Sequence, residues 1–221
     1  MSTNVCACAK APAWQAPNIK HSTFNFQLST FIMRIAIDIG HARATGATGN
    51  GLDEHEVCTA LSRLLADYLG NNNTVQVFDF PGLTNKGDLV ATAKAINEWG
   101  ADVSVSLHCD SSHNATARGG HVIYVSEAGR EVAVEIAARL CAVMPGRADK
   151  TVRKSGLYVL NNTRCPAVLV ECGFLTNSKD ADMLRYEAHR IARAIGLGVA
   201  EWKRKQEIKE MQHEHGSVPQ H

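Results

Sequence analysis

The chain has 221 residues, a formal net charge of +1, 45% hydrophobic residues and 20% charged residues. This composition is ordinary for a globular protein with a sizeable core, and it excludes a chain too polar to fold. Because the charges nearly balance, no global positive field would attract phosphate backbones, and we expect no nucleic-acid partner.

The sequence shows no pattern typical of a membrane span, a signal peptide or a cysteine framework. No apolar run approaches the ~20 residues of a transmembrane helix, so we expect no integral membrane contact. Residues 1–31 carry Gln, Asn, Ser and Thr where a signal peptide is apolar, which predicts synthesis in the cytoplasm without such a peptide. The seven cysteines are odd in number and include no CxxC pair. We therefore expect reduced thiols, with small core side chains at Cys58, Cys141, Cys165 and Cys172.

The pattern of the chain changes abruptly at Met33, where an alternating apolar run begins after an irregular stretch. We expect an irregular N-terminal extension over residues 1–32, a folded domain over 33–202 and a charged, flexible tail over 203–221 that begins as a frayed helical extension. The change also raises the hypothesis that translation starts at Met33, which mass spectrometry of the natural protein would test.

Strand and helix patterns alternate through the folded domain. The predicted strands are 33–39, 74–80, 102–107, 121–125, 156–160 and 166–170, and the predicted helices are 53–69, 88–99, 130–143 and 178–202. Asp53 is the predicted N-cap of the first helix, with Glu56 as its capping-box partner. This alternation is typical of an α/β fold with a mainly parallel sheet covered by helices.

Three reactive side chains each follow an apolar strand directly: His41, His108 and Glu171. In open parallel sheets, reactive groups gather beyond the carboxyl ends of the strands. We therefore expect these three residues to lie at one site.

His41, Glu54 and His108 together suit a catalytic zinc ion, because two imidazoles and one carboxylate leave a coordination position for water. The same donors also suit other divalent metals. Glu171 would then take the proton of the attacking water and return it to the leaving nitrogen, as amide hydrolysis requires.

Each residue alone also has an ordinary explanation. A single His at a strand end is usually a polar loop residue, and Glu54 could simply be a favourable acid in the first turn of a helix. Glu56 competes with Glu54 as a ligand. Glu171 follows five apolar residues, and a buried carboxylate there would need a partner.

Three longer motifs carry a resemblance to a known family. They are Ile35–His41 followed by Gly46–Glu54, then Val103–His108, and Leu157–Leu160 followed by Pro166–Asn177. From about Met33 to Trp202 the sequence resembles the zinc-dependent N-acetylmuramoyl-L-alanine amidases of the amidase-3 family, which includes autolysins and phage endolysins. The resemblance implies a twisted mixed sheet flanked by helices on both faces and cleavage between N-acetylmuramic acid and L-alanine in peptidoglycan.

By the same resemblance, His41, Glu54 and His108 fall on the zinc ligands and Glu171 on the catalytic glutamate. It favours Glu54 over Glu56, because Glu54 closely follows a Gly-Leu turn. The chain departs from the family at Ala42-Arg43, where two glycines are usual, and at Cys109-Asp110, where Ala-Asn is common. We expect Arg43 or Asp110 to contact the muropeptide, and we interpret Cys109 as a plain loop thiol.

The resulting prediction is a monomeric lytic enzyme that acts on the cell wall, by phage-type release or as a host remodelling enzyme. One alternative is a non-catalytic peptidoglycan-binding or regulatory protein on the same fold. Loss of a ligand or of Glu171 would favour that alternative, but all are retained. Another alternative is a zinc carboxypeptidase or an amidohydrolase of other peptides.

Overall fold

The computed structural model describes residues 31–42, 44–80, 82 and 85–216, and its folded unit begins at Phe31. Residues 1–30 of the extension expected over residues 1–32, and the last five residues of the chain, lie outside this range. No described helix is long and apolar enough to cross a membrane.

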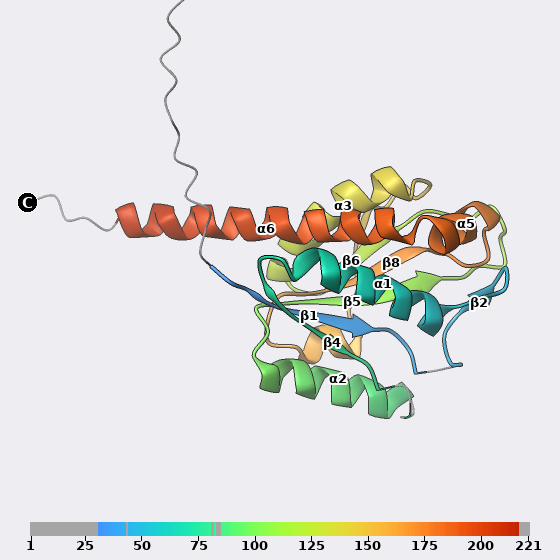
Figure 1. The fold of residues 1–221 in the computed structure, drawn as a ribbon, viewed down its shortest axis with the longest axis horizontal. Coiled ribbons are helices and arrows are strands. Elements are labelled where there is room, and N and C mark those ends of the chain that lie inside the picture. The colour runs from blue at the N-terminus through green and yellow to red at the C-terminus, as the bar shows by residue number, and fades with distance from the viewer. Residues whose placement is uncertain (1–30, 43, 81, 83–84, 217–221) are drawn as a thin grey trace, which may run out of the picture. The chain divides into compact units, whose positions relative to one another are not determined.

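A six-stranded sheet forms the centre of the fold, in the order β4-β1-β5-β8-β6-β7 (Figure 1). Its strands are β4 (Thr74–Phe78), β1 (Arg34–Ile39), β5 (Val103–Asp110), β8 (Ala167–Phe174), β6 (His121–Tyr124) and β7 (Thr151–Arg153). The first four are parallel, whereas β6 runs antiparallel to β8 and parallel to β7. The predicted mainly parallel mixed sheet is confirmed. A small hairpin, β2 (Thr48–Gly49) with β3 (Leu52–Asp53), precedes the first helix.

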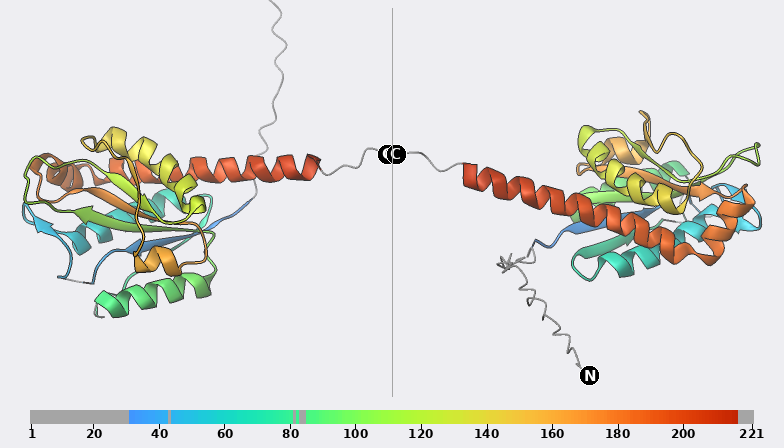
Figure 2. Two further views of the ribbon diagram at one scale, coloured as in Figure 1. Left: turned by 180° about the vertical axis from the view of Figure 1, so that it is seen from behind. Right: turned by 90° about the horizontal axis from the view of Figure 1, so that it is seen from above.

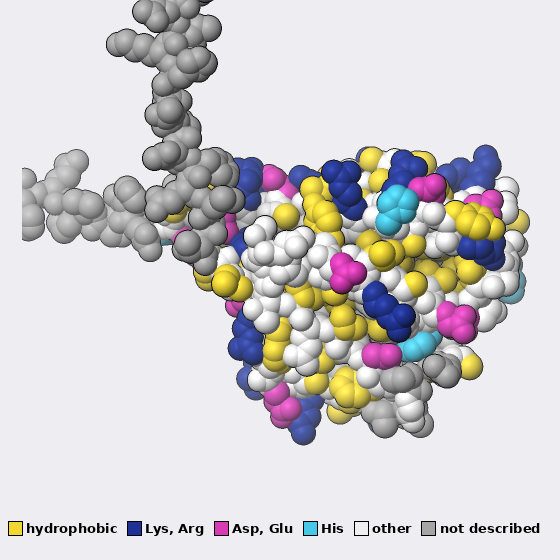
Figure 3. Space-filling view, in the orientation of Figure 1, with side chains coloured by type: hydrophobic (Ala, Val, Ile, Leu, Met, Phe, Trp, Pro, Cys, Tyr) yellow, Lys and Arg dark blue, Asp and Glu magenta, His cyan; other side chains and the backbone are white. Residues whose placement is uncertain are grey.

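Helices cover both faces of this sheet (Figures 1 and 2). On one face, α1 (Glu54–Leu69) and α3 (Glu127–Val143) contact the strands, and α6 (Ala188–Gly216) packs over both helices. On the other face lie α2 (Asn85–Trp99) and the short α4 (Tyr158–Asn162), while α5 (Ser178–Tyr186) follows β8. Charged side chains of both signs are interspersed on the face seen in Figure 3, and the formal net charge of the chain is +1.

The main core lies between the sheet and the α1, α3 and α6 layer. Strand residues that point into it include Ile35, Ile37, Ile39, Val103, Val105, Leu107, Val168 and Val170. Because successive side chains of a strand point to opposite faces, Asp38, Ser106, His108 and Glu171 point to the other side. The face of the sheet opposite the main core therefore carries the polar groups.

The first helix begins as predicted. Asp53 is its N-cap, with extended backbone angles, and its side chain accepts a hydrogen bond of 3.3 Å from the backbone N–H of Glu56. Helix α1 therefore starts at Glu54, and this cap fixes the backbone position from which the Glu54 side chain extends.

One predicted strand is wrong: residues 156–160 do not form a strand, and Tyr158–Asn162 is helix α4. The side chains of Asn161, Asn162 and Thr163 donate hydrogen bonds to carbonyls four residues earlier, which stabilises the helical turn. A short apolar run does not by itself distinguish a buried strand from a buried helix.

The helical extension expected beyond Lys203 is present. Helix α6 continues through Lys203 to Gly216, so residues 203–216 of the expected tail are helical. Its last turns project beyond the sheet in Figures 1 and 2. Lys205 forms an ion pair with Glu135 of α3, and Lys209 forms one with Glu131. These pairs with a neighbouring helix have no signature in the local sequence pattern.

Candidate metal and catalytic site

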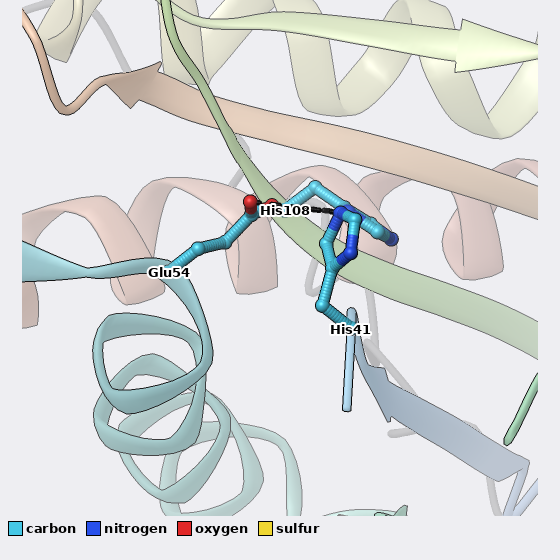
Figure 4. A group of neighbouring side chains, drawn as sticks. All are labelled: His41, Glu54 and His108. Atoms are coloured by element: carbon cyan, nitrogen blue, oxygen red, sulfur yellow. Dashed lines mark hydrogen bonds and ion pairs between the residues drawn. The ribbon is translucent and has the colours of Figure 1, made fainter. Parts of the chain in front are cut away.

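His41, Glu54 and His108 converge at one end of the sheet (Figure 4). They come from the loop after β1, the first residue of α1, and β5. One ligand atom from each lies within 4.8 Å of the others, and among the described residues no other such group of three is found. Glu54 Oε2 lies 3.6 Å from His41 Nε2, and Glu54 Oε1 lies 3.1 Å from His108 Nδ1. This donor set could hold one divalent cation.

Backbone amides hold the Glu54 carboxylate in place. Its Oε2 accepts a hydrogen bond of 2.7 Å from the Ala47 N–H, and its Oε1 accepts one of 2.8 Å from the Cys109 N–H. Burial raises the pKa of Glu54, but the hydrogen bonds from His108 and these amides outweigh it, so the pKa is lowered. The carboxylate is therefore ionised and oriented before a cation arrives.

Two glycines leave room for the cluster. A Cβ at Gly40 would lie 2.3 Å from His108 Cε1, and a Cβ at Gly46 would lie 2.7 Å from Glu54 Oε2. Both distances are shorter than any ordinary contact between such atoms. The two backbone segments can pass this close to the reactive groups only because these residues lack a side chain.

The two histidines respond differently to their surroundings. Burial lowers the pKa of His41 despite the attraction of Glu54, which favours the neutral ring that a metal ligand needs. Burial also lowers the pKa of His108, but the hydrogen bond with Glu54 and the charges of Glu171, Glu54 and Asp38 raise it overall. The same negative surroundings would favour a metal cation beside His108.

Glu171 lies opposite His108 in the pairing of β8 with β5, and opposite His121 in the pairing with β6. Burial, together with the repulsion of Asp110 and Glu54, raises its pKa to about 8, although His108 opposes the shift. Its Oε2 is buried, and no group in the described part of the chain forms a hydrogen bond with it. A carboxyl group in this state can take up or release a proton near neutral pH.

The other predicted site residues fall at different places. Asp110 lies at the end of β5, with its Oδ2 3.5 Å from His121 Nδ1 and 3.7 Å from Arg147 Nη1. Arg43 lies outside the described residues. Glu56 is exposed and is not part of the cluster, so the geometry favours Glu54 as the acidic member.

The two central strands are longer than predicted, so His108 and Glu171 lie within β5 and β8 rather than after them. The prediction of Cys109 as a loop thiol is wrong, because it lies in β5 and is buried in the main core. The pairing of β5 with β8 shifts in register between His108 and Asp110. The predicted strand ended where the apolar pattern ended, and that pattern does not indicate a register shift.

Sequence reasoning missed two buried histidines near the cluster. His55 follows Glu54 in α1, and its Nδ1 lies 2.8 Å from the backbone oxygen of His41. His121 begins β6 next to Glu171, and burial, with the charges of Arg147 and Lys154, lowers its pKa to about 4. The alternation of the predicted strand 121–125 could have indicated His121, but His55 had no comparable signal.

The sequence is similar to known proteins over most of its length. Residues 35–201 match the family model described as N-acetylmuramoyl-L-alanine amidase. The protein YqiI of Bacillus subtilis is 37% identical over 75% of this chain and 82% of its own length. The N-acetylmuramoyl-L-alanine amidase CwlM of Bacillus licheniformis is 30% identical over 76% of this chain and 68% of its own length.

Among solved structures, the catalytic domain of the CD27L endolysin targeting Clostridia difficile superposes with a TM-score of 0.70 at 29% identity. The alignment covers 76% of this chain and 97% of that domain. The family match spans most of the chain, and the structural alignment covers a similar share of it. The chain belongs to the amidase-3 family and is an N-acetylmuramoyl-L-alanine amidase, a peptidoglycan hydrolase.

Proposed function

We propose that this enzyme uses a zinc ion held by His41, Glu54 and His108, with Glu171 as its proton-transfer group. Its reaction would be hydrolysis of the amide bond between N-acetylmuramic acid and L-alanine in peptidoglycan. The observation that carries the proposal is the convergence of three potential ligand atoms within 4.8 Å of one another, from distant parts of the chain.

The residues present fit zinc in a catalytic site. Two imidazole nitrogens and a carboxylate oxygen are a common set of three protein ligands, which leaves coordination positions for substrate and water. The amides of Ala47 and Cys109 support the Glu54 carboxylate, and partners of this kind orient ligands in metal sites. Other divalent ions accept the same donors, so zinc is the proposal and metal analysis is its test.

When bound, zinc would polarise the scissile carbonyl and make water a stronger acid. Glu171 accepts the proton from the attacking water at its unpartnered Oε2. It then donates that proton to the L-alanine nitrogen as the C–N bond breaks, so the products are a free lactyl carboxyl group and a free amine. A positive charge near His108 would lower the pKa of Glu171 and so favour its carboxylate form, which acts as the base.

We further propose that the cell wall is the site of action and that Asp110 contacts the stem peptide. Asp110 belongs to the same strand as His108, two residues further along, and its side chain is 26% exposed. It therefore has both the proximity and the access that a substrate contact needs. Arg43 remains the second proposed contact.

Digestion of purified peptidoglycan, followed by mass spectrometry, tests the proposal. Wild-type protein should release peptides with a free L-alanine amino group, and a chelator should abolish this release until Zn²⁺ is restored. Glu171→Gln should lower turnover by about 10²–10⁴-fold. The matched control is Glu98→Gln, because the Glu98 side chain is 68% exposed in α2.

Undiminished turnover by Glu171→Gln would remove the assigned proton-transfer group. Full activity of protein shown by elemental analysis to contain no metal would remove the zinc site. Cleavage between amino acids, with no new L-alanine amine, would favour a peptidase instead.

A further inference from the structure

The backbone of His41 has an unusual conformation. Its φ angle is +62°, in the left-handed region that residues with a Cβ seldom adopt. The residue before it is Gly40, whose N–H donates a hydrogen bond of 2.9 Å to the Leu107 carbonyl. The chain therefore turns sharply between β1 and the His41 side chain, and this turn directs the His41 ring toward Glu54 and His108.

The side chain of His55, in α1, forms a hydrogen bond with the backbone of this turn. The carbonyl oxygen of His41 can only accept a hydrogen bond, so the Nδ1 of His55, 2.8 Å away, carries the hydrogen and donates it. The other ring nitrogen, Nε2, lies 3.7 Å from Asp79 Oδ2, which follows β4. His55 is 4% exposed, so solvent has little access to compete for either contact.

Glu54 and His55 are consecutive residues in the first turn of α1, and they act on the same partner in different ways. The Glu54 carboxylate faces the His41 ring, whereas the His55 ring bonds the His41 main chain. The start of one helix thus contacts both the side chain and the backbone of His41.

We propose that His55 is a positioning residue, whose Nδ1–H bond to the His41 carbonyl holds the left-handed turn that aims the His41 ring into the metal site. This inference rests on the proposed function, because it assumes that His41 is a ligand. Without this hydrogen bond, the turn would relax toward conformations in which the His41 ring no longer meets Glu54 and His108. Loss of such a supporting contact weakens metal binding by about 10–100-fold in comparable sites.

Two amide substitutions separate this role from simple filling of space. In His55→Asn the amide nitrogen occupies the position of Nδ1, so the bond to His41 can be kept. In His55→Gln the amide lies further from the backbone, at the position of Nε2, so that bond is lost. His55→Phe removes both nitrogens and keeps a ring. Thr59→Val is the matched control, because it removes a different hydrogen bond in α1, from the Thr59 hydroxyl to the His55 carbonyl.

The experiment measures Zn²⁺ affinity of the full chain by chelator competition, and the visible spectrum of the Co²⁺-loaded protein as a report on coordination. Turnover of soluble muropeptides is measured beside them. We expect affinity close to wild type for His55→Asn and Thr59→Val. We expect a loss of about 10–100-fold, with an altered Co²⁺ spectrum, for His55→Gln and His55→Phe.

Equal affinities for His55→Asn and His55→Gln, whether high or low, would overturn the inference, because the position of the donor would then not matter. This comparison stands even if the Phe variant does not fold. Failure of the wild-type protein to bind Zn²⁺ or Co²⁺ would instead overturn the proposed metal site itself.

Discussion

Adding one methyl group at Gly40 should disable the site while leaving the fold intact. The new Cβ would lie 2.3 Å from His108 Cε1, and ordinary contacts begin at 3.4 Å, so the imidazole must move by about 1.1 Å. The φ angle of Gly40 is not in the left-handed region, so the effect would come from this contact rather than from backbone strain. A displacement of about 1 Å in a catalytic geometry can cost 10²-fold in rate.

The assay compares Gly40→Ala with wild type in muropeptide turnover, Zn²⁺ affinity and thermal unfolding. We expect turnover to fall by about 10²-fold, and the free energy of unfolding to fall by about 1–3 kcal/mol because the site is overpacked. Gly82→Ala is the matched control, because a Cβ at Gly82 meets no atom of the described residues within 4 Å. Unchanged turnover and Zn²⁺ affinity in Gly40→Ala would show that the position of the His108 ring is not critical, and the reasoning would be refuted.

Two further outcomes follow from the structure. The pKa of His121 is lowered from 6.5 to about 4, so between these values the unfolded chain binds more protons and stability falls as the pH falls. In metal-free protein, the free energy of unfolding of His121→Gln should therefore fall by about 1–3 kcal/mol less than that of wild type between pH 7 and pH 4.5. Urea denaturation at these two pH values measures the difference. An unchanged pH dependence would contradict the prediction. Removal of the residues after Lys205 deletes the exposed pair of Lys209 with Glu131, and should cost less than about 1 kcal/mol in thermal unfolding without affecting turnover of soluble muropeptides. Complete loss of that turnover would show that the end of α6 is needed for catalysis.

The sequence predicted the parts of the site that strand periodicity determines. His41, His108 and Glu171 each follow apolar runs, and parallel strands bring such positions to one region of the sheet. The cap at Asp53 could also be predicted, because it depends on residues only a few positions apart. These features are local, or follow from a simple rule of sheet topology.

The missed features depend on contacts between distant elements. His55 bonds a backbone carbonyl, and any residue type at position 41 offers a carbonyl, so no side-chain pattern indicates the pair. Ion pairs join α6 beyond Lys203 to α3, and a charged sequence alone does not indicate such pairs, because it is equally typical of a solvated tail. Contacts of this kind depend on tertiary packing, which the local sequence does not indicate.

Alternation along β5 and β8 links the proposed catalytic groups to the hydrophobic core. Each reactive side chain has an immediate neighbour anchored on the far side of the sheet, as His108 has Leu107 and Glu171 has Val170. A substitution that enlarges or shrinks one of these apolar neighbours would shift the chemistry as well as the packing.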